Sequence, residues 1–90
     1  MNETRQTVTV SAGGQDWQVA AHLDDDYEVL TYLGDMQEGS IAAMQKLLRT
    51  VVGDQYDRLI DAGREPDGHV SVAKLGALIT DIIKGSAPNS

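Results

Sequence analysis

Residues 40–53 read SIAAMQKLLRTVVG, and this stretch decides the fold class. Ser40 is a residue type that caps helix N-termini, and Gly53 is the type that most often follows a helix C-terminus. Between them the large apolar residues recur at three- and four-residue intervals, which is the spacing of one helix face. They are Ile41, Met44, Leu47, Leu48, Val51 and Val52. The stretch is therefore predicted to form the most hydrophobic and most central helix of a mainly α fold.

Two further helices are predicted directly before and after this one. Asp25 and Glu28 have the three-residue spacing of a capping box, and Gly39 supplies the stop of the helix that they begin. Asp54 is expected to cap a short helix that ends at Gly63. The central helix is thus predicted to have a helical neighbour on each side in the sequence.

A polar linker and a last helix complete the helical part. Residues 64–69 contain both Pro and Gly, so they are not expected to be helical throughout. Ser71 is expected to cap a helix that runs to Gly85, because aliphatic residues recur there at helical spacing. A helical core is therefore predicted over residues 24–84, followed by a mobile tail at 86–90.

The N-terminal part has the two-residue alternation of β-strands. Residues 7–11 read TVTVS, residues 16–20 read DWQVA, and the stretch AGGQ between them is typical of a turn. These features predict a β-hairpin over residues 7–20, with a frayed N-terminal arm as the alternative. The face expected to be buried carries Val8, Val10, Trp17 and Val19. The predicted fold class is mainly α, a single domain over residues 1–85 with about four short helices and an N-terminal hairpin.

The composition fits one small globular domain. Of 90 residues, 41% are hydrophobic and 23% are charged, so the chain can close one core but not two. The net charge of −7 repels a phosphate backbone, and direct binding of nucleic acid is therefore not expected. There is no Lys or Arg between Gln6 and Gln45, so the first half is strongly acidic while the second half is balanced.

Export and membrane signals are not apparent. The chain has no cysteine, which argues against a disulfide framework and an oxidising compartment. Its first residues lack the apolar segment of a signal peptide, and no apolar run approaches the roughly 18 residues of a membrane span. We expect a cytoplasmic protein without a membrane partner.

The acidic residues, histidines and serines do not have the spacing of known metal-binding or catalytic motifs. The acidic run at 24–28 lacks the later Gly and Glu of a calcium loop, and in the stretch 63–74 a glycine and a lysine occupy the first and last ligand positions. His22 and His69 have no neighbours that complete a zinc ligand set. There is no nucleophile turn and no glycine-rich phosphate loop. We expect no catalytic site, no cofactor and no metal.

The abundance of aliphatic residues is the positive signal for function. Core filling accounts for most of them, but four short helices seldom bury every apolar position, and an exposed strip binds partners. Methionine side chains are flexible enough for adaptable contacts. The residues predicted to face a partner are Met36, Met44, Leu48, Val52, Leu75, Leu78 and Ile82.

Three strings in the helical part carry a family resemblance. They are MQKLLR at 44–49, VGDQYDRL at 52–59 and DGHVS at 67–71. Over residues 24–84 the chain resembles the small tail assembly chaperones of long-tailed (siphophage-type) bacteriophages and prophages. The resemblance implies a non-catalytic factor that coats the tape measure protein, in the cytoplasm of the bacterial host, while tail tube proteins polymerise around it. Such families often also make a frameshifted longer form.

Two other classes of protein remain open. One is a small acidic regulatory adaptor whose first half imitates nucleic acid and binds a basic protein. The other is a structural head–tail connector, which would be found in finished particles, whereas an assembly chaperone would be absent from them. Homo-oligomerisation also remains open at this point.

Overall fold

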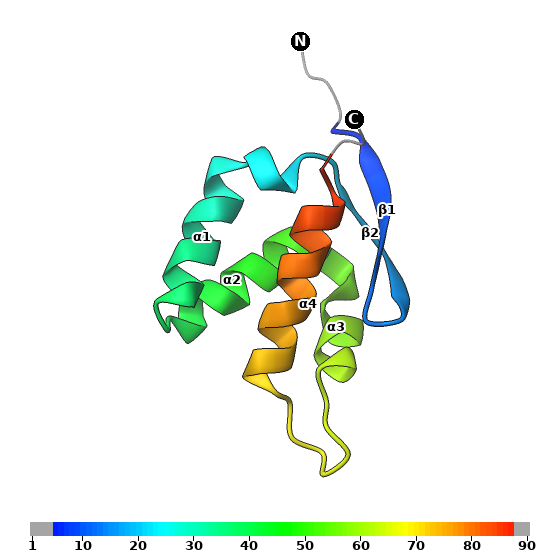
Figure 1. Ribbon diagram of the computed structural model, residues 1–90, viewed down its shortest axis with the longest axis vertical. Helices are drawn as coiled ribbons and strands as arrows, with labels where there is room; N and C mark the ends of the chain where they lie inside the picture. The colour runs from blue at the N-terminus through cyan, green and yellow to red at the C-terminus, as the bar shows by residue number, and fades with distance from the viewer. Residues whose placement is uncertain (1–4, 88–90) are drawn as a thin grey trace.

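The computed structural model describes residues 5–87 (Figure 1). The chain begins with a β-hairpin, formed by β1 (Thr7–Ala12) and β2 (Gln15–Ala20), and continues in helices. The α-helices are α1 (Tyr27–Gln37), α2 (Ile41–Val52), α3 (Tyr56–Ala62) and α4 (Val72–Gly85). Short 3₁₀ turns, η1 (Leu23–Asp25) and η2 (Gly53–Gln55), precede α1 and α3. The predicted mainly helical fold with an N-terminal hairpin is confirmed, although α3 has only 7 residues while α1, α2 and α4 have 11 to 14.

The hairpin turns through the two glycines at 13–14, whose φ angles of +61° and +75° are conformations that glycine adopts readily. The strands pair antiparallel, with Val10 opposite Trp17 and Val8 opposite Val19. Val10, Trp17 and Val19 are buried and Val8 is half-buried. The predicted hairpin and its inner face are therefore confirmed, and the alternative of a frayed arm is wrong for residues 5–20.

Two helix caps lie where the sequence predicts them. Ser40 Oγ accepts a hydrogen bond from the Ala43 N–H at 3.0 Å, and Ser71 Oγ accepts one from the Lys74 N–H at 3.1 Å. Each serine satisfies a backbone donor that the first turn of its helix leaves free. As a result, α2 and α4 each begin at the residue after the serine, and Gly53 follows the last residue of α2.

The caps of α1 and α3 differ from the prediction. Asp26, not Asp25, caps α1, and its carboxylate accepts a hydrogen bond from the Val29 N–H at 3.0 Å. The three residues before it already coil into η1, which leaves Asp26 as the extended residue ahead of α1. Asp54 lies within η2, and no side chain caps α3, because η2 passes directly into that helix.

The Asp26 carboxylate makes stability sensitive to acid. The hydrogen bond from the Val29 N–H lowers its pKa, and the Arg5 guanidinium, 2.8 Å away, lowers it further against the opposing effect of burial. The folded-state pKa therefore lies below the unfolded value of about 3.9, so this stabilisation is present above the unfolded pKa and is lost as pH falls through the folded pKa.

Replacement of Asp26 by Asn should show this effect directly, because Asn also caps helices but carries no charge. We expect Asp26→Asn to lower the free energy of unfolding by roughly 0.5–1 kcal/mol at neutral pH. The difference from the wild type should shrink as pH falls below about 4. Urea unfolding at a series of pH values measures it, and a difference that stays constant down to acid pH would contradict the assignment.

One core joins the hairpin to the helices. In Figure 1, α4 lies in front of α2, with the hairpin on one side and α1 on the other. The helix α4 contacts β1 and α2, whereas α1 packs mainly against α2. The largest fully buried side chains come from the hairpin and from each of α1, α2, α3 and α4; they include Trp17, Val29, Leu47, Leu59, Ile79 and Ile82. Within residues 5–87, every buried side-chain nitrogen and oxygen has a hydrogen-bond partner.

Glycines bring α4 close to its neighbours. A Cβ at Gly85 would lie 2.4 Å from Val10 Cγ1, and a Cβ at Gly63 would lie 2.6 Å from Leu75 Cδ2. Both distances are too short for a real carbon contact, so these positions need a residue without a side chain. Gly63 follows α3 as predicted, but its φ of −87° means that close packing, not a left-handed conformation, requires the glycine there.

Gly76 has no such role, although it lies inside α4. A Cβ there would meet only Met44 Cε, at 3.8 Å, which is an ordinary contact. Because glycine costs helices roughly 0.5–1 kcal/mol relative to alanine, Gly76→Ala should raise the free energy of unfolding by about that amount. Gly85→Ala is the matched control and should lower it, because the new methyl group would overlap Val10. Urea denaturation of both variants checks the pair, and a loss of stability in Gly76→Ala would contradict the packing described.

Ser86, the first residue of the predicted mobile tail, is held by hydrogen bonds. Ser86 is buried, its Oγ accepts a hydrogen bond from the Leu23 N–H at 3.0 Å, and its carbonyl accepts one from the His22 N–H at 3.0 Å. These bonds tie the end of α4 to the segment that joins the hairpin to α1. The tail prediction is therefore wrong for Ser86, and residues 88–90 lie outside the described residues.

Candidate functional site

The structure buries most of the residues that the sequence analysis predicts to face a partner. Met36 is partly buried, and the other six have exposed fractions of 6% or less; they are Met44, Leu48, Val52, Leu75, Leu78 and Ile82. These six side chains fill the core because α2 and α4 pack against each other and against the hairpin. The prediction that these residues form an exposed strip is therefore wrong. A partner can reach such side chains only at the bottom of a depression.

An apolar depression reaches some of these side chains, and we call it the apolar groove. It encloses about 180 Å³ and lies between α2, α3 and the start of α4. Met44, Leu48 and Leu75, three of the predicted residues, line it and are buried. The remaining lining residues are Ile41, Gln45, Tyr56, Ile60, Val70 and Val72. The groove thus combines a buried aliphatic floor with more exposed walls.

Two exposed aliphatic side chains stand at the groove. Ile41 is 60% exposed and Val72 is 54% exposed, high fractions for β-branched residues of this size. Each is the first residue of its helix and follows a capping serine, so the caps fix where these two side chains project. Helical spacing places Ile41 and Val72 on the apolar faces of their helices, and neither is among the residues predicted from the sequence to contact a partner. Their position at the first turn, at the margin of the apolar stripe, is the signal that could have identified them.

A cation lies beside the groove wall. The Arg49 guanidinium carbon is 4.0 Å from the centre of the Tyr56 ring, a cation–π arrangement. Among residues 5–87, no carboxylate forms an ion pair with Arg49. The first turns of α2 and α4, which also line the groove, carry the partial positive charge of helix N-termini. The surroundings of the groove therefore favour a ligand with an apolar side chain next to an acidic one.

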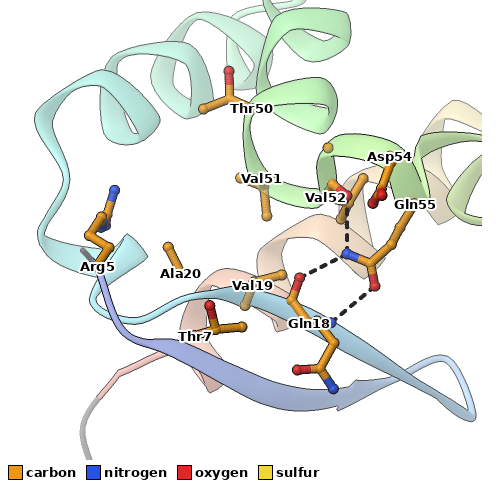
Figure 2. Close-up of a pocket in the computed structure, with 11 residues that line it drawn as sticks. Arg5, Thr7, Gln18, Val19, Ala20, Thr50, Val51, Val52, Asp54 and Gln55 are labelled. Atoms are coloured by element: carbon orange, nitrogen blue, oxygen red, sulfur yellow. Dashed lines mark hydrogen bonds between the residues drawn. The ribbon is translucent and has the colours of Figure 1, made fainter.

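A second depression has a more polar lining than the groove, and some of its lining residues form hydrogen bonds with one another. It lies between β2 and the end of α2 and encloses about 480 Å³ (Figure 2). The Gln55 side chain donates to the Gln18 carbonyl at 2.8 Å and accepts from the Gln18 N–H at 3.0 Å. Gln55 also donates to the Val52 carbonyl at 3.0 Å. This amide joins the hairpin to the helices, so we assign it a structural role.

The next feature is the distribution of the His, Asp and Glu side chains. No group of three His, Asp or Glu side chains that could hold a metal ion occurs within residues 5–87. His69 Nδ1 contacts the exposed carboxylate of Asp67, and the His69 N–H lowers the pKa of that carboxylate. This pair lies in the loop before α4 and is not part of the groove lining. Of the helices that the structure describes, none combines the length and apolarity needed to cross a bilayer.

Comparisons with models of known protein families, with curated proteins and with solved structures find no significant match.

Proposed function

We propose that this domain is a non-catalytic binding protein whose apolar groove holds one face of an amphipathic helix from a protein partner. The observation that carries the proposal is the exposure of Ile41 and Val72 beside a groove with a buried aliphatic floor. Exposed aliphatic residues around a depression are typical of protein interaction sites. A helix that lies in such a groove is held by apolar side chains spaced three or four residues apart.

The size of the groove favours a side chain over a free small molecule. Its volume of about 180 Å³ is below the roughly 300–1,000 Å³ of most small-molecule pockets. The Met44 side chain on its floor is flexible, so the groove can adjust to different aliphatic or aromatic residues. Arg49 can pair with an acidic residue on the polar side of the same helix. These features suit a receptor for many similar amphipathic segments.

We propose further that the partner is a phage tape measure protein, and that the domain acts as a tail assembly chaperone in the bacterial host cytoplasm. This step is supported by the resemblance of residues 24–84 to that family and by the groove, which suits long helical proteins with repeated apolar faces. The net charge of −7 supports it as well, because a strongly charged coat keeps an aggregation-prone partner in solution. Binding must be weak enough for tail tube proteins to displace the chaperone.

Co-expression with a phage tape measure protein tests this function. We expect the soluble yield of the tape measure protein to rise several-fold, and the domain to be absent from purified particles. If the yield does not rise, the chaperone function is wrong. If the domain is a stoichiometric component of finished particles, the connector class takes its place.

A further inference from the structure

The two strands of the hairpin differ in what lies at their outer edges. In an antiparallel pair, every second residue turns its N–H and C=O away from the other strand. Gln18 is such a residue, because its backbone groups bond the Gln55 side chain on the side of β2 away from β1 (Figure 2). Thr9 is the residue opposite Gln18, so its backbone groups also point outward, from the other edge of the sheet. The same alternation places the outward groups of β1 at Thr7, Thr9 and Ser11.

The outer edge of β2 is closed to pairing by side chains of the same chain. The Gln55 amide occupies both backbone groups of Gln18, in the way that a neighbouring strand would. Arg58 donates to the Asp16 carbonyl at 3.0 Å while its guanidinium stacks 4.1 Å above the Trp17 ring. A further strand would have to displace both side chains.

The outer edge of β1 is open. Thr7, Thr9 and Ser11 are exposed, and no residue in the range 5–87 accepts a hydrogen bond from their outward N–H groups. Proteins usually protect such an edge with a charge, a proline, a bulge or a covering element. β1 reads TVTVSA, without charge or proline, and its pairing with β2 is regular from end to end. The strand therefore presents an unprotected template for another strand.

We propose that β1 pairs antiparallel with β1 of a second copy, which joins two hairpins into one four-stranded sheet. Twofold symmetry with Thr9 opposite Thr9 of the second copy places Thr7 opposite Ser11, so all three outward residues find backbone partners. Val8, which is half-buried in the single chain, then lies opposite Val10 of the second copy on the inner face. The apolar face of the hairpin continues across the dimer.

Three features favour a second copy over an extended segment of another protein. The pairing is self-complementary, since one six-residue strand supplies both sides. Each chain has one open and one closed edge, so association stops at two chains. β1 carries no charge in a chain of net charge −7, so the two acidic bodies approach at a neutral strand. None of the residues of β1 lines the apolar groove, and the inference does not rest on the proposed function.

Sedimentation equilibrium of the wild-type chain, together with amide hydrogen exchange, tests the dimer. We expect a mass that rises with concentration from 9.7 kDa towards twice that value. Exchange at Thr7, Thr9 and Ser11 should slow at least tenfold over the same concentrations, while other amides in the hairpin stay unchanged. A monomer at all concentrations up to about 1 mM would overturn the proposal, and so would a dimer without slower exchange at these three residues.

A pair of variants at one position separates backbone pairing from side-chain effects. Thr9→Pro removes the outward N–H but none of the backbone bonds to β2, so it should remain folded by circular dichroism and be monomeric. Thr9→Val keeps the N–H and should dimerise like the wild type. Both variants lose the hydrogen bond that Gln18 Nε2 donates to Thr9 Oγ1 at 2.7 Å, so this loss does not distinguish them. A folded Thr9→Pro that still dimerises would overturn the proposal. If Thr9→Pro does not fold, the exchange measurement on the wild type decides alone.

Discussion

Replacement of Trp17 by Ala is expected to lower the free energy of unfolding by about 3–5 kcal/mol, the largest effect on stability that we predict for a single substitution. Trp17 is completely buried, donates from Nε1 to the Ala12 carbonyl at 3.0 Å, and lies under the Arg58 guanidinium. Its removal leaves a cavity between the hairpin and the helices and leaves the Ala12 carbonyl without that donor. Because domains of this kind are stable by only about 5–15 kcal/mol, the variant should unfold at markedly lower urea concentration.

Tyr27→Ala is the matched control for the loss of an aromatic ring. Tyr27 is 87% exposed at the start of α1, so its replacement should change the free energy of unfolding by less than about 0.5 kcal/mol. Urea titrations followed by circular dichroism measure both variants. If Trp17→Ala costs less than about 1 kcal/mol, the hairpin does not pack on the helices in the way described.

The double substitution of Ile41 and Val72 by Asp is expected to abolish binding of the partner and leave the fold intact. Both side chains are more than half exposed, so a carboxylate at either position remains solvated. Acidic residues are favourable in the first turn of a helix, which further protects the fold. At the groove the same carboxylates would require desolvation against an apolar partner and would repel its acidic residues. We expect at least a tenfold loss of affinity and no rise in soluble tape measure protein on co-expression.

A second double variant controls for charge and helix position. Ala42 and Ala73 each follow one of the two groove residues, are exposed, and do not line the groove. Replacing both by Asp changes the net charge equally, in the same helix turns, and should leave binding within about twofold of the wild type. If both double variants lose binding equally, charge repulsion and not the groove determines affinity.

Local sequence signals predicted most of the secondary structure for identifiable reasons. The hairpin follows from two glycines between alternating runs, and the starts of α2 and α4 follow from the bonds that Ser40 and Ser71 make within one helix turn. The start of α1 was displaced by one residue because η1 uses the residues before Asp26. Local signals predict a mobile tail from Ser86 onward because its partners, Leu23 and His22, are distant in the sequence.

The candidate site was harder to predict, because periodicity identifies an apolar face but not what covers it. Met44 and Leu78 have the same helical spacing as exposed apolar residues would have, yet α2 and α4 bury both. Ile41 and Val72 look like ordinary members of the same stripes, and their exposure depends on how the first turns of α2 and α4 meet. The closed edge of β2 depends on Gln55, which lies 37 residues after Gln18. Such contacts are set by tertiary packing, which spacing along the chain does not encode.

Chemical-shift mapping by NMR tests the central claim most directly. The ¹⁵N-labelled domain is titrated with overlapping peptides that cover the proposed partner, a phage tape measure protein. We predict that peptides with an amphipathic helical pattern bind, and that the largest shifts occur at Ile41, Tyr56 and Val72, around the apolar groove. If no peptide produces shifts, or if the shifts concentrate on β1 and leave the groove unchanged, the groove is not the binding site and the account is contradicted.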